Sequence, residues 1–134
     1  MKRVIPLLLL VCIPMLGACQ GSGSRYEDPA ELATLIANAT APDALLYYLV
    51  DVRTPDEYSR GHLPTAVNVP NTEIGARPPT TDKAALIIVY CASGGRSTAS
   101  KKVLDDLGYT RVVNFGAVGR WTGVLVTGDK PGPG

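Results

Sequence analysis

Residues 84–97 read Ala-Ala-Leu-Ile-Ile-Val-Tyr-Cys-Ala-Ser-Gly-Gly-Arg-Ser, and this segment is the strongest indication of the fold class. Its first part, 84–89, is a continuous apolar run, which is typical of a strand covered on both faces. A loop of small residues follows. Residues 97–107 then have apolar or small side chains at helical spacing and end before Gly108, a common helix-ending residue. A buried strand joined to a helix in this way predicts one unit of an α/β sheet.

The segments on either side repeat this alternation of strands and helices. Three further apolar runs are candidate strands: 45–50, 66–69 and 111–115. Helices are predicted to begin at Asp28 and at Thr54, because each is followed by proline and, three residues later, by glutamate. We therefore expect an α/β domain over residues 26–127, with a central parallel sheet flanked by helices on both faces.

The N-terminal residues predict an export signal that does not join this domain. An apolar run, 4–16, follows two basic residues, contains two prolines and is shorter than the ~20 residues of a membrane-spanning helix. Residues 16–19, Leu-Gly-Ala-Cys, resemble the lipobox of bacterial lipoproteins, in which cleavage precedes a cysteine that becomes lipid-modified. We therefore predict a signal peptide over 1–18 and lipidation of Cys19. The alternative is ordinary cleavage that leaves a free thiol.

The two ends of the processed chain are predicted to have little fixed structure. Residues 19–25 are rich in glycine and serine and predict a lipid-anchored flexible tether. Residues 128–134 end in Pro-Gly-Pro-Gly and predict a disordered tail. The lipid would place the domain on the periplasmic side of a bacterial envelope, and Gln20 after the cysteine favours the outer membrane.

Charge and cysteine content narrow the range of functions. Without the signal peptide the chain keeps 11 of its 13 basic residues and all 12 acidic ones, so no basic field favours nucleic acid as a partner. Cys12 leaves with the signal peptide and Cys19 carries lipid, which leaves Cys91 without a disulfide partner. An unpaired thiol in an oxidising compartment indicates either burial or chemistry.

The loop that begins at Cys91 has the properties of an anion cradle. Cys91 follows the carboxyl end of a predicted parallel strand, where α/β sheets bind ligands. Two glycines allow backbone N–H groups to turn inward, and the helix N-terminus that follows favours negative charge. Arg96 adds a permanent positive charge, so we expect a lowered pKa for Cys91 and a stabilised thiolate. The alternative is an inert buried cysteine beside a structural arginine.

This loop, Cys-Ala-Ser-Gly-Gly-Arg-Ser, resembles the active-site loop of rhodanese sulfurtransferases. Other segments are similar to the family's upstream and C-terminal motifs: 49–58, 61–64, 66–70, 108–109, 112–113 and 116–121. Ala117 departs from the pattern, because a second glycine is usual there. The resemblance implies a rhodanese-like fold and a single-domain enzyme of the thiosulfate sulfurtransferase type, in which Cys91 carries sulfur as a persulfide.

The resemblance also implies the remaining site residues and the partners. The backbone amides of the loop would hold the transferred sulfur: Ala92, Ser93, Gly94, Gly95, Arg96 and Ser97. No metal or organic cofactor is implied. The partners would be a small-molecule sulfur donor and a thiol or cyanide acceptor, with the protein acting as a monomer. Thiosulfate and mercaptopyruvate both remain open as donors.

Loop length separates the reaction classes on this fold. Four residues stand between Cys91 and Arg96, whereas the related phosphatases have a longer loop that fits phosphate or arsenate. The shorter ring suits one sulfur atom and disfavours a phosphatase or arsenate reductase. A persulfide carrier or a non-catalytic partner-binding module remains the alternative, although an inactive module would be expected to lack the cysteine or its cradle.

Four residues outside the loop also need an interpretation. His62 is the only histidine and would suggest a Cys–His dyad, but Gly-His in this motif looks like a structural histidine. Asp51 and Arg53 predict an ion pair at a strand end, with a supporting influence on the loop second. Trp121 is predicted to belong to the core.

Overall fold

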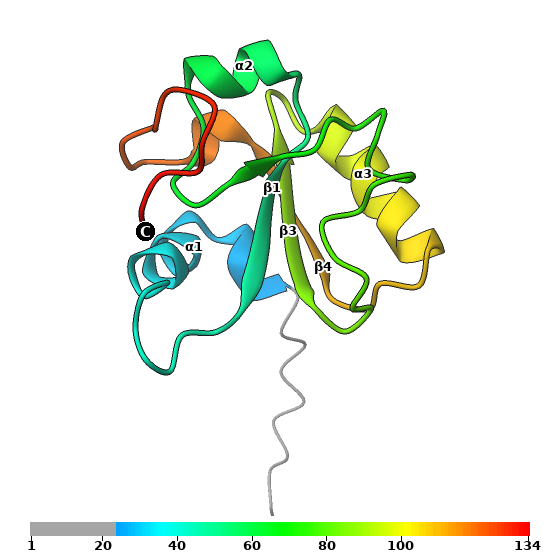
Figure 1. Ribbon diagram of the computed structural model, residues 1–134, viewed down its shortest axis with the longest axis horizontal. Helices are drawn as coiled ribbons and strands as arrows, with labels where there is room; N and C mark the ends of the chain where they lie inside the picture. The colour runs from blue at the N-terminus through cyan, green and yellow to red at the C-terminus, as the bar shows by residue number, and fades with distance from the viewer. Residues whose placement is uncertain (1–23) are drawn as a thin grey trace, which may run out of the picture.

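A computed structural model describes residues 24–134, and a parallel β-sheet runs through their centre (Figure 1). Its four strands are β1 (Tyr47–Asp51), β2 (Val67–Asn68), β3 (Leu86–Cys91) and β4 (Val112–Ala117). They lie in the order β2-β1-β3-β4, and every neighbouring pair is parallel. The predicted α/β architecture with a central parallel sheet is confirmed.

Helices cover both faces of this sheet. The longer ones are α1 (Pro29–Ala37), on one face, and α3 (Gly95–Asp106), on the other (Figure 1). A short helix, α2 (Pro55–Arg60), lies at the edge where the strands end. The loop that joins β3 to α3 therefore lies at the same edge as α2. Residues 24–134 also contain two 3-10 turns, η1 (Ser24–Glu27) and η2 (Val118–Arg120).

Capping side chains fix the beginnings of α1 and α2. The Asp28 carboxylate accepts the N–H groups of Ala30 at 2.8 Å and Glu31 at 3.1 Å. At α2, Thr54 and Glu57 form the predicted reciprocal capping box. At α1 the second half of the predicted box is replaced, because the Glu31 carboxylate pairs with Arg25 at 2.6 Å.

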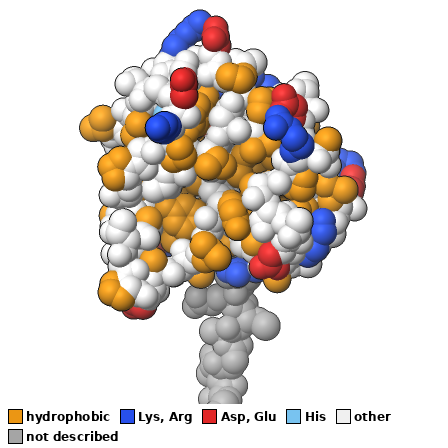
Figure 2. All heavy atoms as spheres, viewed as in Figure 1, with side chains coloured by type: hydrophobic (Ala, Val, Ile, Leu, Met, Phe, Trp, Pro, Cys, Tyr) orange, Lys and Arg blue, Asp and Glu red, His pale blue; other side chains and the backbone are white. Residues whose placement is uncertain are grey.

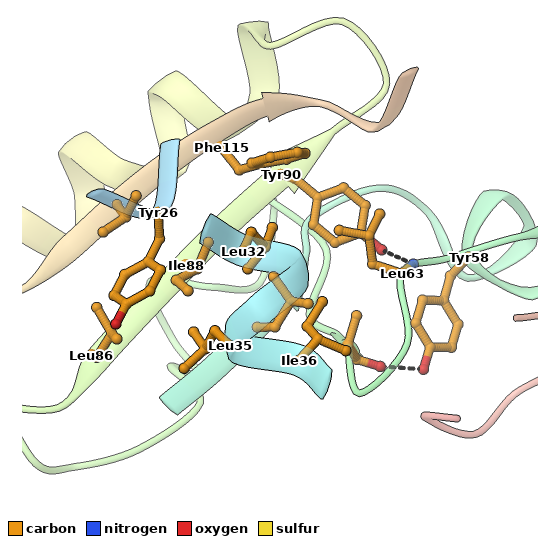
Figure 3. Packing of buried hydrophobic residues seen from close by; sticks show 13 residues of the cluster. Tyr26, Leu32, Leu35, Ile36, Tyr58, Leu63, Leu86, Ile88, Tyr90 and Phe115 are labelled. Atoms are coloured by element: carbon orange, nitrogen blue, oxygen red, sulfur yellow. Dashed lines mark hydrogen bonds between the residues drawn. The ribbon is translucent and has the colours of Figure 1, made fainter. Parts of the chain in front are cut away.

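Alternate residues of β1 and β3 enter two separate hydrophobic cores. Ile88 and Tyr90 of β3 point to the α1 side, where they meet Leu32 and Phe115 (Figure 3). Val89 and Cys91 point to the α3 side, where they share a cluster with Leu104. Since both faces of β3 are covered, its continuous apolar sequence is explained.

The surface seen in Figure 2 has no large region of one charge sign. Positive and negative side chains lie next to each other along its upper and right-hand edges, and hydrophobic patches lie between them. Independently of this view, α3 carries two exposed ion pairs, Lys101 with Asp105 and Lys102 with Asp106, both at 2.7 Å. Charged side chains of both signs are thus interspersed on this face.

Three element boundaries differ from the sequence-based prediction. Leu46 lies before β1 and is 75% exposed, although the apolar run 45–50 predicted a buried strand throughout. Strand β3 continues as far as Cys91, and α3 begins at Gly95 rather than near Ser97. The loop between β3 and α3 is thus shorter than expected, because its second half already belongs to the first turn of the helix.

The C-terminal segment has hydrogen bonds to the domain, which differs from the predicted disordered tail over 128–134. The Gly128 N–H donates to the Ser59 carbonyl at 2.8 Å, and the Thr65 N–H donates to the Gly132 carbonyl at 3.1 Å. In Figure 1 this segment passes from α2 toward the end of α1. The composition of this segment predicted that its backbone groups would bond only to water. Some of them instead form hydrogen bonds with the domain.

The predicted signal peptide, the lipidated Cys19 and most of the tether lie outside the described residues. Positions 24 and 25 of that tether belong to η1. Within residues 24–134, no helix has the length and apolar character needed to cross a membrane.

Candidate active site

Cys91 is the last residue of β3, and its side chain is completely buried. Its Sγ accepts the backbone N–H of Gly94 at 3.0 Å and that of Ser97 at 3.4 Å. The hydroxyl oxygen of Ser97 lies 3.5 Å away from the same sulfur. The loop therefore turns its donors inward onto Sγ, as expected for an anion cradle.

Gly94 gives the loop this shape through its backbone. Its φ of +102° lies in the left-handed region that glycine adopts without strain, and a Cβ there would meet nothing within 4 Å. The requirement for glycine is thus conformational rather than a matter of space. Its carbonyl accepts the hydroxyls of Ser97 at 3.0 Å and Thr98 at 2.8 Å, which fixes the turn to the first residues of α3.

These contacts decide the ionisation of the thiol. Burial raises the pKa of Cys91, but hydrogen bonds from the Ser97 hydroxyl and from the amides of Ser97, Gly94 and Ser93 outweigh it, so the pKa is lowered from its usual value. A thiolate is the reactive form of cysteine. Of the loop residues expected to surround the sulfur, Gly94 and Ser97 thus contact it directly. The side chains of Ala92 and Ser93 are exposed at the surface.

Arg96 has a partner that the sequence did not indicate. Its Nη1 contacts Glu57 Oε2 at 2.7 Å, and its Nη2 contacts Glu57 Oε1 at 2.8 Å. Arg96 and the Thr54 amide hold the pKa of Glu57 at about 2. The pKa of Arg96 is raised mainly by Glu57 and to a smaller extent by attraction to Cys91. The positive charge that we expected at the loop is therefore present, but it is paired with a carboxylate.

Glu57 is thus a site residue that the sequence reasoning missed. Its place in a capping box explained it fully at the local level, and Arg96 is 39 positions further along the chain. The contact between Glu57 and Arg96 becomes apparent only in the fold, which places α2 and the start of α3 at the same edge of the sheet.

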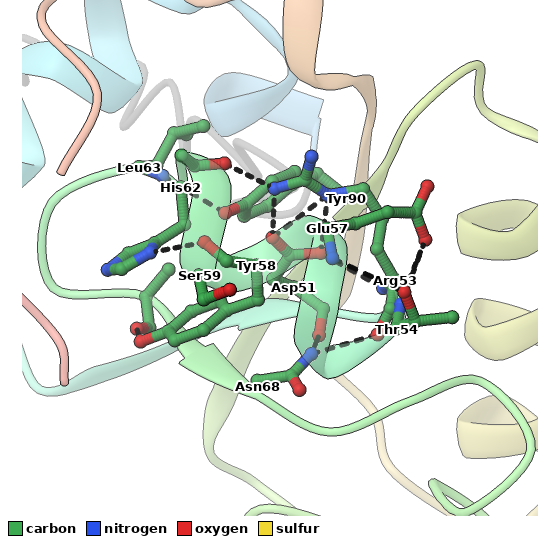
Figure 4. A network of polar contacts seen from close by, with 12 residues as sticks. Asp51, Arg53, Thr54, Glu57, Tyr58, Ser59, His62, Leu63, Asn68 and Tyr90 are labelled. Carbon is green, nitrogen blue, oxygen red and sulfur yellow. Dashed lines mark hydrogen bonds and ion pairs between the residues drawn. The ribbon is translucent and has the colours of Figure 1, made fainter. Parts of the chain in front are cut away.

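The expected pair of Asp51 and Arg53 is present and buried beneath α2 (Figure 4). Arg53 Nε lies 2.9 Å from Asp51 Oδ1, and Arg53 Nη2 lies 2.5 Å from Oδ2. Nη2 also donates to the Gly61 carbonyl at 2.6 Å, and Asn68 Nδ2 donates to the carbonyls of both Asp51 and Arg53. These bonds tie the end of β1 to β2 and to the turn after α2.

His62 is fully buried and is held between two carbonyl groups. Nδ1 lies 2.9 Å from the Tyr58 carbonyl oxygen, and Nε2 lies 3.1 Å from that of Lys130. Its ring stacks on the Tyr58 ring with 3.7 Å between centroids. Both ring nitrogens are thus used within the fold, which matches the structural histidine and not the Cys–His dyad. Trp121 is only half-buried and packs against the hydrophobic core on the α1 side of the sheet.

Metal ligation has no support in the part of the chain that the structure describes. No group of three or more His, Cys, Asp or Glu side chains there is arranged to hold an ion. The reactive group that the structure shows at this site is the buried thiol of Cys91, whose pKa is lowered by its hydrogen bonds.

Comparisons with known proteins agree with this geometry. Residues 28–121 match the family model of the rhodanese-like domain. The thiosulfate sulfurtransferase PspE of Escherichia coli is 38% identical over 71 residues, covering 52% of this chain and 68% of that protein. A thiosulfate:glutathione sulfurtransferase of Saccharomyces cerevisiae is 37% identical over 98 residues, covering 61% and 68%.

Solved structures give the same result. A structure described as a rhodanese with anions from E. coli aligns with a TM-score of 0.59 and 33% identity, covering 62% of this chain and all of that one. A human single-domain sulfurtransferase aligns with a TM-score of 0.55 over 64% of this chain and 83% of its own; at 23% identity it supports the fold alone. The chain belongs to the rhodanese-like domain family.

Proposed function

We propose that this protein is a sulfurtransferase in which the Cys91 thiolate accepts a sulfane sulfur atom, holds it as a persulfide and passes it to a second nucleophile. The observation that carries this proposal is the set of contacts to Cys91 Sγ, which receives the amides of Gly94 and Ser97 and lies beside the Ser97 hydroxyl. Similarity to named sulfurtransferases supports the same class of reaction.

The first half-reaction is written here for thiosulfate. The thiolate attacks the outer sulfur, a new S–S bond forms on Cys91, and the old S–S bond breaks with its electron pair leaving on sulfite. Charge balances, because a monoanion and a dianion give a persulfide monoanion and a sulfite dianion. Inward N–H groups of the loop would stabilise the negative sulfur in both states.

In the second half-reaction an acceptor attacks the outer sulfur of the persulfide. Cyanide would leave as thiocyanate, or a thiolate would leave as a new persulfide, and the Cys91 thiolate is restored. No metal or organic cofactor takes part in either step. The donor leaves before the acceptor reacts, so a ping-pong kinetic pattern is expected.

Mass spectrometry of the intact protein tests the proposal. Incubation with thiosulfate, followed by removal of the excess, should add the mass of one sulfur atom to wild-type protein and none to Cys91→Ser. Ser100→Ala, which removes another buried hydroxyl from α3, is the matched control and should still load. A wild-type spectrum unchanged by thiosulfate, mercaptopyruvate and organic thiosulfonates would contradict sulfur transfer and favour a partner-binding module.

Steady-state kinetics then separate the enzyme from its alternatives. An enzyme should produce thiocyanate over many turnovers, whereas a persulfide carrier should load once and wait for a partner. An aryl phosphate should be hydrolysed more slowly than sulfur is transferred, because the ring between Cys91 and Arg96 is short. The reverse order of rates would favour a phosphatase.

We also propose that the protein is anchored by lipid at Cys19 on the periplasmic side of the envelope, in the outer membrane of a Gram-negative host. The support is the Leu-Gly-Ala-Cys sequence at 16–19. The wild-type protein should fractionate with membranes, and Cys19→Ser should be released or left unprocessed. Unmodified mature protein free in the periplasm would contradict the anchor.

A further inference from the structure

Glu57 closes a bidentate ion pair with Arg96 at the loop that carries Cys91. The two bonds use both terminal nitrogens of the guanidinium, at 2.7 and 2.8 Å. About a third of each side chain remains exposed, so the pair lies at the surface of the site and not in the core. An incoming anion therefore meets an arginine whose end-on donors already hold a carboxylate.

The Glu57 carboxylate is fixed independently of Arg96. Its Oε2 accepts the Thr54 backbone N–H at 3.0 Å and the Thr54 hydroxyl at 3.0 Å. Swinging Glu57 aside would break the capping box of α2 as well as the ion pair. The negative charge beside the loop is thus a permanent feature of the site.

The negative groups around Arg96 balance its positive charge, so little net positive charge remains to attract a donor. Glu57, Cys91 and Asp51 all attract its guanidinium. The next cation, Arg53, is bound to Asp51 in a buried pair. With Cys91 as thiolate, these groups carry more negative charge than positive. A donor is repelled here in proportion to its own charge.

We propose that Glu57 is a specificity-determining residue that disfavours dianionic sulfur donors and favours sulfane sulfur carried by donors of lower charge, such as organic thiosulfonates and persulfides. This inference rests on the proposed sulfur transfer through Cys91. Thiosulfate remains a substrate, but at each encounter its second negative charge faces the fixed carboxylate.

Two donors that differ in charge but share the reacting bond test this directly. Thiosulfate is a dianion, and methanethiosulfonate is a monoanion that transfers the same sulfur and releases a sulfinate. In ping-pong kinetics, kcat/KM for the donor reports the first half-reaction alone. Glu57→Gln removes the charge, and glutamine at this position still supports a capping box.

We expect Glu57→Gln to raise kcat/KM about 10-fold for thiosulfate and about 3-fold for methanethiosulfonate at low ionic strength, because Coulomb energy scales with donor charge. The gains should shrink as salt screens the site. The ratio of the two constants does not depend on how much of a preparation is folded. Wild-type protein gives a second measurement, because added salt should raise the rate with thiosulfate more than that with methanethiosulfonate.

Asp56→Asn is the matched control. Asp56 is the neighbouring carboxylate on α2, pairs with Arg60 at 3.3 Å and lies at the surface, so the substitution removes the same charge without touching Arg96. Its effect on either donor should stay below about twofold. A similar change in Asp56→Asn and Glu57→Gln would show a general charge effect and overturn the inference.

Equal gains, or equal losses, with the two donors in Glu57→Gln would also overturn it, because Glu57 would then only hold Arg96 in position. This failure differs from failure of the proposed function. In the first case the wild-type protein still gains one sulfur atom on Cys91; in the second, neither donor adds mass to it.

Discussion

The hydroxyl oxygen of Ser97 lies 3.5 Å from the Sγ of Cys91. It also lies 3.0 Å from the Gly94 carbonyl oxygen, to which it can donate its proton while Cys91 is a neutral thiol. When Cys91 ionises, the same proton can turn to the sulfur. By rotating its hydroxyl group, Ser97 can thus form a hydrogen bond in both the thiol and the thiolate state of Cys91.

Ser97→Ala should raise the pKa of Cys91, because it removes the largest of the contacts that lower it. The thiolate would then form at higher pH, so the pH profile of alkylation by iodoacetamide should move upward and the rate at neutral pH should fall by roughly 3- to 30-fold. Ser100→Ala on the same helix is the control and should leave the profile in place. A downward shift in Ser97→Ala would mean that burial, and not hydrogen bonding, controls this thiol.

Arg96→Ala should lower kcat/KM for thiosulfate by about 10- to 1,000-fold, or about 1.4 to 4 kcal/mol. The loss has two causes, since the donor loses a cation and meets an unpaired Glu57. Arg96→Lys should recover only part, because an ammonium group cannot reproduce the planar guanidinium. The lifetime of the persulfide should change much less, because the amides of Gly94 and Ser97 are retained. If the persulfide lifetime fell by as large a factor as the loading rate, Arg96 would be the group that holds the sulfur.

His62→Ala should destabilise the fold by roughly 2 to 4 kcal/mol in urea unfolding, because it removes a buried ring that packs on Tyr58 and contacts two carbonyl groups. The pH profile of Cys91 alkylation should be unchanged in the folded variant. Ser97→Ala serves as the contrasting control, since it should move the profile with little loss of stability. A shift of that profile in His62→Ala would support the Cys–His dyad.

Asp51→Asn should cost about 3 kcal/mol of unfolding free energy, because Arg53 would keep its charge in a buried place without a matching carboxylate. Asp56→Asn breaks an exposed pair with Arg60 and should cost less than about 0.5 kcal/mol. Chemical denaturation at one pH measures both. Equal losses would mean that the Asp51–Arg53 pair contributes no more than a surface ion pair.

The features that depend on neighbours along the chain could be predicted from the amino-acid sequence alone. Apolar runs predicted the strands, the Thr54–Glu57 pattern predicted the capping box, and the small residues after Cys91 predicted inward-turned amides. Each of these follows from steric and hydrogen-bonding rules that act within a few residues. The resemblance to rhodaneses, which identified Cys91 as the nucleophile, also depends on a short local motif.

The contacts between distant segments became visible only in the folded domain. It placed Glu57 against Arg96, brought the Lys130 carbonyl to His62, and bonded Gly128 to Ser59 of α2 and Gly132 to Thr65. Their partners stand far away in the sequence, so no local pattern distinguishes them from solvent-exposed residues. The parallel strands bring these partners together because all their carboxyl ends lie along one edge, where the nucleophile and the charges that act on it are assembled.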